Sequence, residues 1–210
     1  MDNVVSDQIL KQFVKRAPET KKYIKQLKSP LILNPQHQPP FSYLIRAITY
    51  QQLSGKAANT IYNRFLVKVG KLTPENVLKL KFEELKSCGL SRQKSSYIQN
   101  VAEAFSPQGF LSHLATLDEL DTLQSKEILE QFTQIKGVGE WTVHMFLIFS
   151  LGRLDILAPA DLGIKKGVQQ IYGLDELPTP GIAKKTVAHW GDLSTVGCLL
   201  CYELVDGGMD

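Results

Sequence analysis

Two short segments, about twenty residues apart, carry the residue types in this sequence that could do chemistry. The first is Ile-Lys-Gly-Val-Gly-Glu-Trp-Thr at residues 135–142, where two glycines precede a helix-forming stretch. The second is Pro-Ala-Asp-Leu-Gly at residues 159–163, where Asp161 opens a further helix. A backbone turn that binds an anion and one positioned carboxylate are the parts needed to hold a DNA strand and attack a nucleotide within it.

The glycine-rich segment predicts a helix–hairpin–helix over residues 125–151. Gly137 and Gly139 allow positive φ angles and leave the backbone open to close approach. The amides that begin the second helix point outward at the positive end of the helix dipole, where they can bind a phosphate, and Thr142 can add a hydroxyl. Val138 is expected to pack under the turn. The alternative is a tight turn between helices that binds nothing.

The carboxylate of Asp161 stands at a typical helix start, after Ala-Pro-Ala and before Leu-Gly-Ile-Lys-Lys. As an N-cap, it would accept hydrogen bonds from amides two or three residues further on. Such bonds favour the ionised form and fix its direction. The carboxylate could then stabilise positive charge that develops on a sugar as a base departs, and it could orient a water. The alternative is a purely structural cap.

Composition and charge narrow the class of protein. The chain has 210 residues, of which 43% are hydrophobic and 21% charged, as in an ordinary globular protein with one large domain or two small ones. The net charge of +3 is only mildly basic. Basic residues are concentrated in the first thirty positions and again after Asp161. They form either solvated helix faces or a surface that faces phosphates. The apolar run at residues 145–149 is too short to cross a bilayer, and the N-terminus lacks a secretory signal. We expect an intracellular protein without membrane association.

Three cysteines are an odd number for a disulfide framework in an intracellular chain. Cys198 and Cys201 are expected to pack inside a buried helix, because no second pair exists to complete a tetrahedral zinc site. An iron–sulfur cluster also requires four thiolates. No metal or other cofactor is expected.

Helical periodicity runs through almost the whole sequence, and no alternating apolar stretch predicts a sheet. Thr73 is expected to cap a helix, and Gly89 suits a left-handed position at a helix end. Residues 29–40 contain four prolines and predict an extended connector. Pro178 and Pro180 are expected to break the chain before a last helix. The predicted fold class is all-α.

Several segments, taken in order and spacing, resemble one known family. The matching stretches are residues 44–54, 56–65, 88–94, the hairpin, and 151–156 leading to 161–164. They resemble the helix–hairpin–helix DNA glycosylases with a Gly/Pro-rich loop and an essential aspartate. Within that superfamily the chain is most similar to the alkylation-repair 3-methyladenine DNA glycosylases of the short fungal or bacterial type.

The resemblance implies two helical subdomains with a cleft between them. Both termini, residues 1–35 and 174–210, would form one. Residues 36–173 would form the other, with the hairpin at 125–151 and a catalytic loop at 155–163. The partner would be double-stranded DNA with damaged bases, whose damaged nucleotide is flipped into the cleft. We expect a monomer, located in the nucleus if the organism is eukaryotic and in the cytoplasm or nucleoid if it is prokaryotic.

The resemblance also implies roles for individual residues, with Asp161 as the catalytic group. The residues that would bind the DNA backbone are Gly137, Val138, Gly139 and Thr142. The loop that would insert into the duplex, in place of the flipped nucleotide, is Gln51, Gln52 and Leu53. The residues that would line the base pocket are Trp141, Met145, Leu162 and Tyr202.

One position predicts the reaction type. In the branch of the family that also cuts the strand, a lysine immediately precedes the hairpin threonine and forms a Schiff base with C1′; this chain has Trp141 there. The resemblance therefore implies a monofunctional glycosylase that uses water to excise alkylated purines, such as 3-methyladenine and 7-methylguanine, in base excision repair. The last helix departs from the family pattern, with Ser194 for a common arginine and Leu199 for a bulky aromatic. Two alternatives therefore stay open: a lesion-binding protein with little or no activity, or a glycosylase for deaminated or mismatched bases.

Overall fold

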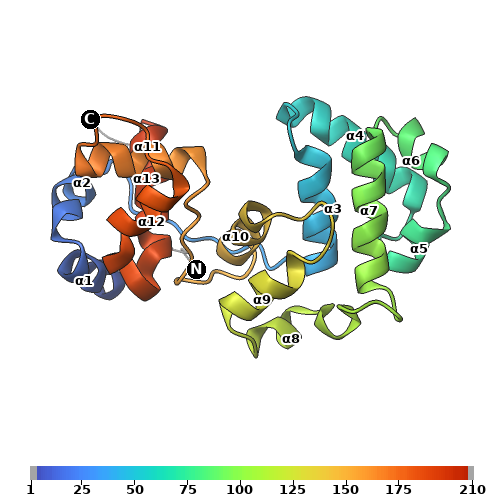
Figure 1. Cartoon of the computed structure of the whole chain (residues 1–210), viewed down its shortest axis with the longest axis horizontal. Helices are drawn as coiled ribbons and strands as arrows, with labels where there is room; N and C mark the ends of the chain where they lie inside the picture. The colour runs from blue at the N-terminus through green and yellow to red at the C-terminus, as the bar shows by residue number, and fades with distance from the viewer. Residues whose placement is uncertain (1–3, 208–210) are drawn as a thin grey trace. The chain divides into compact units, whose positions relative to one another are not determined.

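The computed structural model describes residues 4–207 and consists of helices joined by turns and loops (Figure 1). No strand is assigned within this part of the chain, and an isolated antiparallel bridge pairs Val4 with Ile32. The predicted all-α fold class is confirmed. The chain divides into two compact units, one formed by residues 1–36 and 147–210 and the other by residues 37–146.

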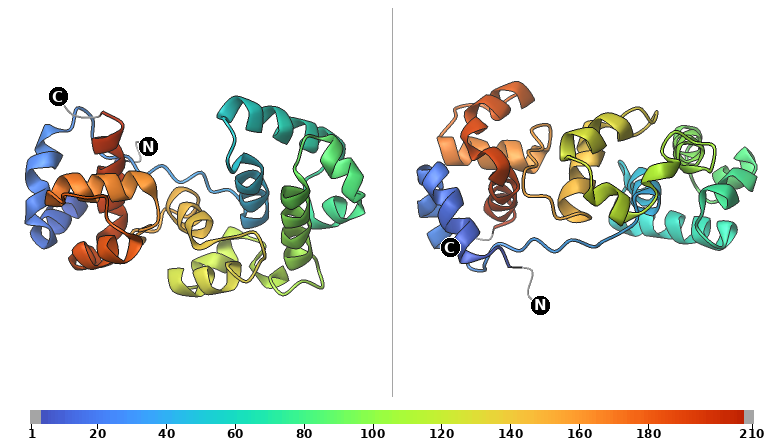
Figure 2. Two further views of the ribbon diagram at one scale, coloured as in Figure 1. Left: turned by 45° about the horizontal axis from the view of Figure 1, so that its top comes forward. Right: turned by 90° about the horizontal axis from the view of Figure 1, so that it is seen from below.

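The first unit joins the two ends of the chain. Its α-helices are α1 (Asp7–Arg16), α2 (Lys21–Gln26), α11 (Leu162–Tyr172), α12 (Pro180–Thr186) and α13 (Ser194–Val205), with 3-10 turns at Pro18–Thr20 and Ala188–Leu193. Helices α11 and α13 pack side by side (Figures 1 and 2). They approach closely because Gly167 has no side chain: a Cβ there would lie 2.3 Å from the Cβ of Cys201. Cys198 and Cys201 are both fully buried, as predicted.

The second unit is built around α7. Its helices are α3 (Pro40–Tyr50), α4 (Gly55–Val69), α5 (Pro74–Lys79), α6 (Phe82–Ser87), α7 (Arg92–Phe105), α8 (Leu117–Asp121) and α9 (Ser125–Phe132), with a 3-10 turn at Ser112–Leu114. Helix α7 packs against α3, α5 and α6 (Figure 2). Helix α10 (Glu140–Phe149) starts in this unit, and the division between the units falls inside it. Phe132 stacks on Phe146 with ring centroids 5.7 Å apart, which joins α9 to the first part of α10.

The division between the units differs from the expected one. The sequence placed a boundary after residue 173, whereas in the structure residues 147–173 belong with the two termini. The reason is packing between segments distant in sequence: α11 lies along α13, and the loop before α11 is hydrogen-bonded to Thr195 of α13. The local sequence of residues 147–173 does not predict these contacts.

Between the late prolines and the last helix, the structure has a further helix that the sequence did not predict. Pro180 does not interrupt a helix but begins α12, with the hydroxyl of Thr179 accepting a hydrogen bond from the amide of Ile182. A proline is well suited to the first turn of a helix, where its missing amide would have had no partner. Pro178 lies outside any helix, as expected.

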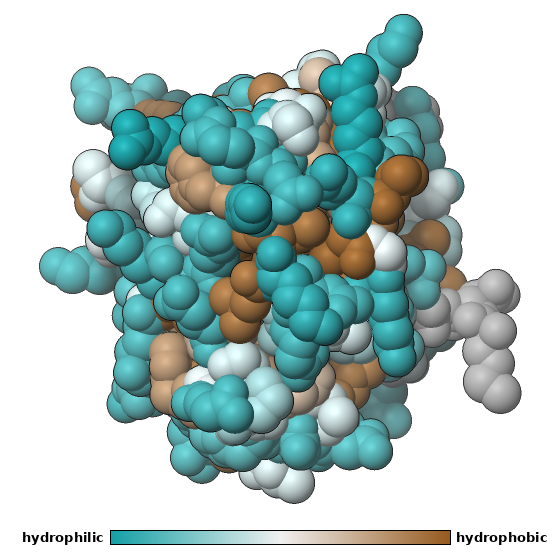
Figure 3. All heavy atoms as spheres, turned by 90° about the vertical axis from the view of Figure 1, so that its right-hand side faces the viewer, coloured by the Kyte–Doolittle hydropathy of each residue, from teal (hydrophilic) through white to brown (hydrophobic). Residues whose placement is uncertain are grey.

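One face of the second unit is largely hydrophilic. Figure 3 shows the face that carries the helices at the right of Figure 1, where hydrophilic side chains surround smaller groups of hydrophobic ones. Val67 of α4 and Leu78 of α5 are among the exposed large hydrophobic side chains. None of the helices between residues 4 and 207 is both long and apolar enough to span a membrane.

Candidate functional site

Two residues of α7 hold the first half of the glycine hairpin. Gly137 has a φ of +106°, and a Cβ at this position would lie 2.2 Å from Cγ of Tyr97. The side-chain amide of Asn100 donates a hydrogen bond to the carbonyl of Lys136, at 2.9 Å. Val138 is 4% exposed, so the prediction that it packs under the turn is confirmed. The conformation and the packing both require glycine at position 137.

Gly139 has a different role from Gly137. Its φ does not lie in the left-handed region, and a Cβ built on it would meet nothing within 4 Å. The carbonyl of Gly139 accepts the amide of Val143 at 3.2 Å, so α10 begins directly after it. The positive end of the helix dipole therefore lies beside open space, which a side chain at position 139 would occupy. This is the geometry expected for an anion site that uses the main chain.

Three residues of α10 that the sequence assigned to DNA or base contacts differ in accessibility. The side chain of Trp141 is 45% exposed, whereas that of Met145 is 8% exposed. Thr142 is buried and only 3% exposed, so its hydroxyl has little accessible surface to offer a phosphate. The contact of the DNA backbone with Thr142 stays a prediction. The part of the hairpin whose geometry suits an anion is the exposed main chain at Gly139.

The expected inserting loop follows α3 in the second unit. Helix α3 ends at Tyr50, whose carbonyl accepts the amide of Leu53 at 3.3 Å. Between them, Gln52 has a φ of +56°, which is uncommon for a residue other than glycine. The side chain of Leu53 is 40% exposed. The loop therefore presents one large apolar side chain from a constrained backbone turn.

The candidate catalytic carboxylate belongs to the first unit. Asp161 is the N-cap of α11, and its Oδ1 accepts a hydrogen bond from the amide of Ile164 at 3.1 Å. The predicted cap is confirmed. Its own amide donates to the carbonyl of Ala158 at 3.0 Å, and its carbonyl accepts the amide of Lys165 at 3.0 Å. The carboxylate is thus fixed by the helix start that the sequence indicated.

The loop that leads to Asp161 is fastened to α13 by Thr195. The hydroxyl of this fully buried residue donates to the carbonyl of Arg153, at 2.8 Å, and accepts the amide of Ile156, at 3.1 Å. Its amide donates to the carbonyl of Leu154 at 2.9 Å. The sequence prediction did not include Thr195, because a threonine inside an apolar helix gives no signal of its partners some forty residues away.

Tyr202 of α13 lies against the start of α11 beside Asp161. A Cβ on Gly163 would lie 3.0 Å from two atoms of the Tyr202 ring and 3.2 Å from Oδ1 of Asp161. Burial raises the pKa of the Tyr202 hydroxyl well above its usual value, and the negative charge of Asp161, to which the hydroxyl is hydrogen-bonded, raises the pKa further. The neutral hydroxyl therefore acts as a donor to the carboxylate. The ring also packs on Phe149, with centroids 6.2 Å apart.

Two cysteines near Asp161 are buried, whereas the neighbouring Leu162 is exposed. Burial raises the pKa of the Cys198 thiol to about 12, and the charge of Asp161 contributes in the same direction. Burial also raises the pKa of Cys201, and the neighbouring Cys198 and Asp161 contribute in the same direction. Both thiols are therefore protonated and inert at neutral pH. Leu162, the expected pocket residue that follows the carboxylate, is 53% exposed.

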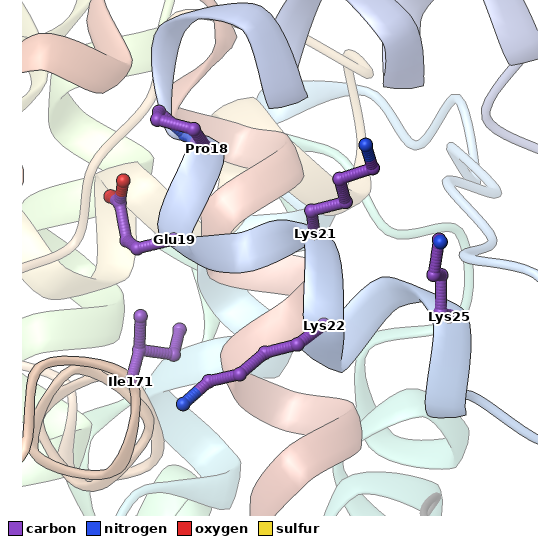
Figure 4. A pocket seen from close by; sticks show the side chains of 6 residues that line it. All are labelled: Pro18, Glu19, Lys21, Lys22, Lys25 and Ile171. Carbon is purple, nitrogen blue, oxygen red and sulfur yellow. The ribbon is translucent and has the colours of Figure 1, made fainter.

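A separate pocket in the first unit does not contain the candidate site. It is lined by Pro18, Glu19, Lys21, Lys22, Lys25 and Ile171. Figure 4 shows that the amine of Lys22 points away from the amines of Lys21 and Lys25, so the three cations do not converge on one anion. Within residues 4–207, no group of three or more His, Cys, Asp or Glu side chains is arranged to hold a metal ion.

Comparison with known proteins shows which family this chain matches. Residues 45–192 match the model of the HhH-GPD superfamily base excision DNA repair proteins. The chain is 40% identical to DNA-3-methyladenine glycosylase 1 of Schizosaccharomyces pombe over 147 residues, which are 69% of this chain and 63% of that protein. The chain therefore matches somewhat less than two thirds of that relative's length.

Two solved structures extend the similarity over most of the fold. A DNA-3-methyladenine glycosidase from Bacillus halodurans is 31% identical, with a TM-score of 0.83 over 96% of this chain and 91% of that one. A 3-methyladenine DNA glycosylase from S. pombe, in complex with abasic DNA, is 33% identical, with a TM-score of 0.71 over 87% and 89% of the two chains. The family model covers the Gln51–Leu53 loop, the hairpin and the capped aspartate. This chain belongs to the HhH-GPD superfamily of base excision DNA repair proteins.

Proposed function

We propose that this protein is a monofunctional DNA glycosylase that excises alkylated purines, of the 3-methyladenine and 7-methylguanine type, from double-stranded DNA in base excision repair. The observation that carries the proposal is the capped carboxylate of Asp161, held by the amide of Ile164 and by Tyr202. Membership of the superfamily and the names of the similar glycosylases support the same substrate class. The hairpin and the Gln51–Leu53 loop supply the means to hold and distort a duplex.

In the proposed reaction the bond between C1′ and the base nitrogen breaks, and its electron pair leaves with the base. An alkylated purine that carries a positive charge becomes neutral as it departs, so it needs little help from an acid. Positive charge develops on the sugar, and the ionised carboxylate of Asp161 stabilises it. Water then attacks C1′, and the carboxylate takes up the water's proton. The products are the free base and an abasic site.

The proposal excludes a lyase step because of the residue before Thr142. A Schiff base with C1′ requires an amine, and Trp141 occupies the position that carries the lysine in strand-cutting relatives. Lys136 lies before the glycines, and its carbonyl is bound by Asn100 of α7. Borohydride reduction of a mixture with abasic DNA should therefore leave no covalent complex. A trapped complex would contradict this part of the proposal.

The function is tested by incubating the protein with methylated duplex DNA and measuring release of 3-methyladenine and 7-methylguanine. We expect release of free base and accumulation of abasic sites in equal amounts. Tight binding to the lesion without release, under single-turnover conditions, would instead favour the lesion-binding alternative. Release only from duplexes with deaminated or mismatched bases would replace the proposed substrate class.

A further inference from the structure

Helix α7 contributes a lysine to the backbone of the inserting loop. The amine of Lys94 donates hydrogen bonds to the carbonyl of Thr49, at 2.8 Å, and to the carbonyl of Gln51, at 2.6 Å. Both acceptors lie at the C-terminal end of α3, where backbone carbonyls lack partners within the helix. A cation is favourable there because it faces the negative end of the helix dipole. Lys94 thus ties the loop to a helix of the unit's core.

The surroundings of Lys94 distinguish it from a surface lysine. Its side chain is only partly exposed, and desolvation by burial lowers the pKa of its amine. A partly desolvated amine forms stronger charge-assisted bonds with carbonyl oxygens than one in open water. Since two of its hydrogen-bonding positions are used inside the protein, the amine is engaged with the loop rather than presented to a phosphate.

The loop has a reason to need such a fastening. The positive φ of Gln52 costs free energy in a residue with a side chain, and such strained conformations persist only where the surroundings hold them. Backbone bonds to α3 flank this residue: the amide of Gln51 donates to the carbonyl of Ala47 at 3.1 Å, and the amide of Leu53 donates to the carbonyl of Tyr50 at 3.3 Å. The two bonds from Lys94 fix the carbonyls of Thr49 and Gln51, which lie on the N-terminal side of the strained residue.

From this geometry we infer that Lys94 is a positioning residue, which pre-forms the Gln51–Leu53 loop so that Leu53 can enter the duplex when a nucleotide is flipped out. The inference rests on the proposed function for the role of the loop. An ordered loop avoids the entropy of ordering at the moment of insertion. Lys94 therefore contributes to recognition of the distorted duplex and not to the general attraction for DNA.

The test compares Lys94→Met with the wild type on two duplexes, one undamaged and one with a tetrahydrofuran abasic-site analogue. We expect binding to the analogue to weaken roughly tenfold, as for loss of charged hydrogen bonds, while binding to undamaged duplex changes less than about twofold. Lys94→Arg, which can donate to both carbonyls, should restore most of the affinity. An equal loss on both duplexes would overturn the inference, because it would make Lys94 a phosphate contact.

A double-mutant cycle tests whether Lys94 acts through the loop. In a Leu53→Ala background the effect of Lys94→Met on binding to the analogue should largely disappear. Full additivity of the two changes would overturn the inference. Lys68→Met is a matched control in the same unit, because the Lys68 amine pairs at 3.1 Å with Glu84 on α6 and does not contact the loop. It should leave the preference for the analogue unchanged.

Amide hydrogen exchange in the DNA-free protein separates failure of the inference from failure of the proposed function. Lys94→Met should accelerate exchange at residues 51–53, while α4 and α5 keep their protection and the protein remains folded. Unchanged exchange in this loop would overturn the inference whatever the DNA does. If the loop loosens as expected but the wild type releases no base from methylated DNA, the positioning role stands and the proposed enzyme fails.

Discussion

The two glycines of the hairpin predict opposite outcomes for the same substitution. At Gly137, alanine must adopt a φ of +106° and place its Cβ 2.2 Å from Cγ of Tyr97. The left-handed conformation costs about 1–2 kcal/mol, and the ring must move by roughly 1 Å, for which overpacking costs about 1–3 kcal/mol. At Gly139, alanine has no strained φ and meets nothing within 4 Å.

We therefore expect Gly137→Ala to lower the free energy of unfolding by about 2–5 kcal/mol, which corresponds to a fall in Tm of about 5–15 °C for a protein of this size. Gly139→Ala should change the free energy of unfolding by less than about 1 kcal/mol. Gly139→Val should nevertheless weaken binding to every duplex, damaged or not, because its side chain occupies the space beside the amides of α10. Gly181→Val serves as the control, because a Cβ built on Gly181 also meets nothing within 4 Å and because Gly181 lies in α12, in the unit that does not contain the hairpin.

Thermal unfolding and fluorescence anisotropy with an undamaged duplex measure these effects. Two results would refute the reasoning. The first is a Gly137→Ala protein as stable as the wild type, which would mean that Tyr97 does not close on the turn. The second is unchanged DNA binding by Gly139→Val, which would mean that the open backbone at the hairpin is not where the phosphate binds.

Three further predictions concern residues of the first unit. In Gly163→Ala, the new Cβ pushes on the ring of Tyr202 and on Oδ1 of Asp161. The rate of single-turnover excision should therefore fall about tenfold or more while Tm changes little, and a loss of stability without a loss of rate would contradict this. Burial raises the pKa of Glu19, but hydrogen bonds from Tyr172 and His189 outweigh it and leave the pKa below the ordinary 4.5. Ionised Glu19 then stabilises the fold above about pH 4.5, and this stability is lost as pH falls through the lowered pKa, so Glu19→Gln should lower Tm more at pH 7 than at pH 3; an equal effect at both values would count against it. Because of their raised pKa values and burial, the thiols of the last helix should react with iodoacetamide at pH 8 only after unfolding, as peptide mapping would reveal.

Features fixed by neighbouring residues could be predicted from the sequence. The hydroxyl of Thr73 caps α5 by accepting the amide of Asn76 at 3.3 Å, and Gly89 follows α6 with a φ of +100°, as their residue types indicated. The N-cap at Asp161 was predictable for the same reason, because a carboxylate after Ala-Pro-Ala bonds to an amide three residues on. Helix starts and ends depend on a few adjacent residues.

Features fixed by distant residues could not be predicted in this way. Tyr97 closes on Gly137 from forty residues away, and Lys94 binds the carbonyls of Thr49 and Gln51, which precede it by about as much. The contact of Tyr202 with Asp161 follows from the packing of α13 on α11, which also moved the boundary between the units. The family resemblance predicted the loop and the carboxylate. The residues that hold them in place, such as Lys94 and Tyr202, could be identified only from the structure.

The most direct test of the account is single-turnover excision of 7-methylguanine by Asp161→Asn. Asparagine is as good an N-cap as aspartate, so the substitution removes the charge while α11 keeps its start. We predict a rate at least about 100-fold below that of the wild type, as for loss of a principal electrostatic contact in the transition state, with Tm and affinity for the abasic analogue little changed. A variant that releases the base at the wild-type rate would show that the carboxylate at the start of α11 does not perform the reaction.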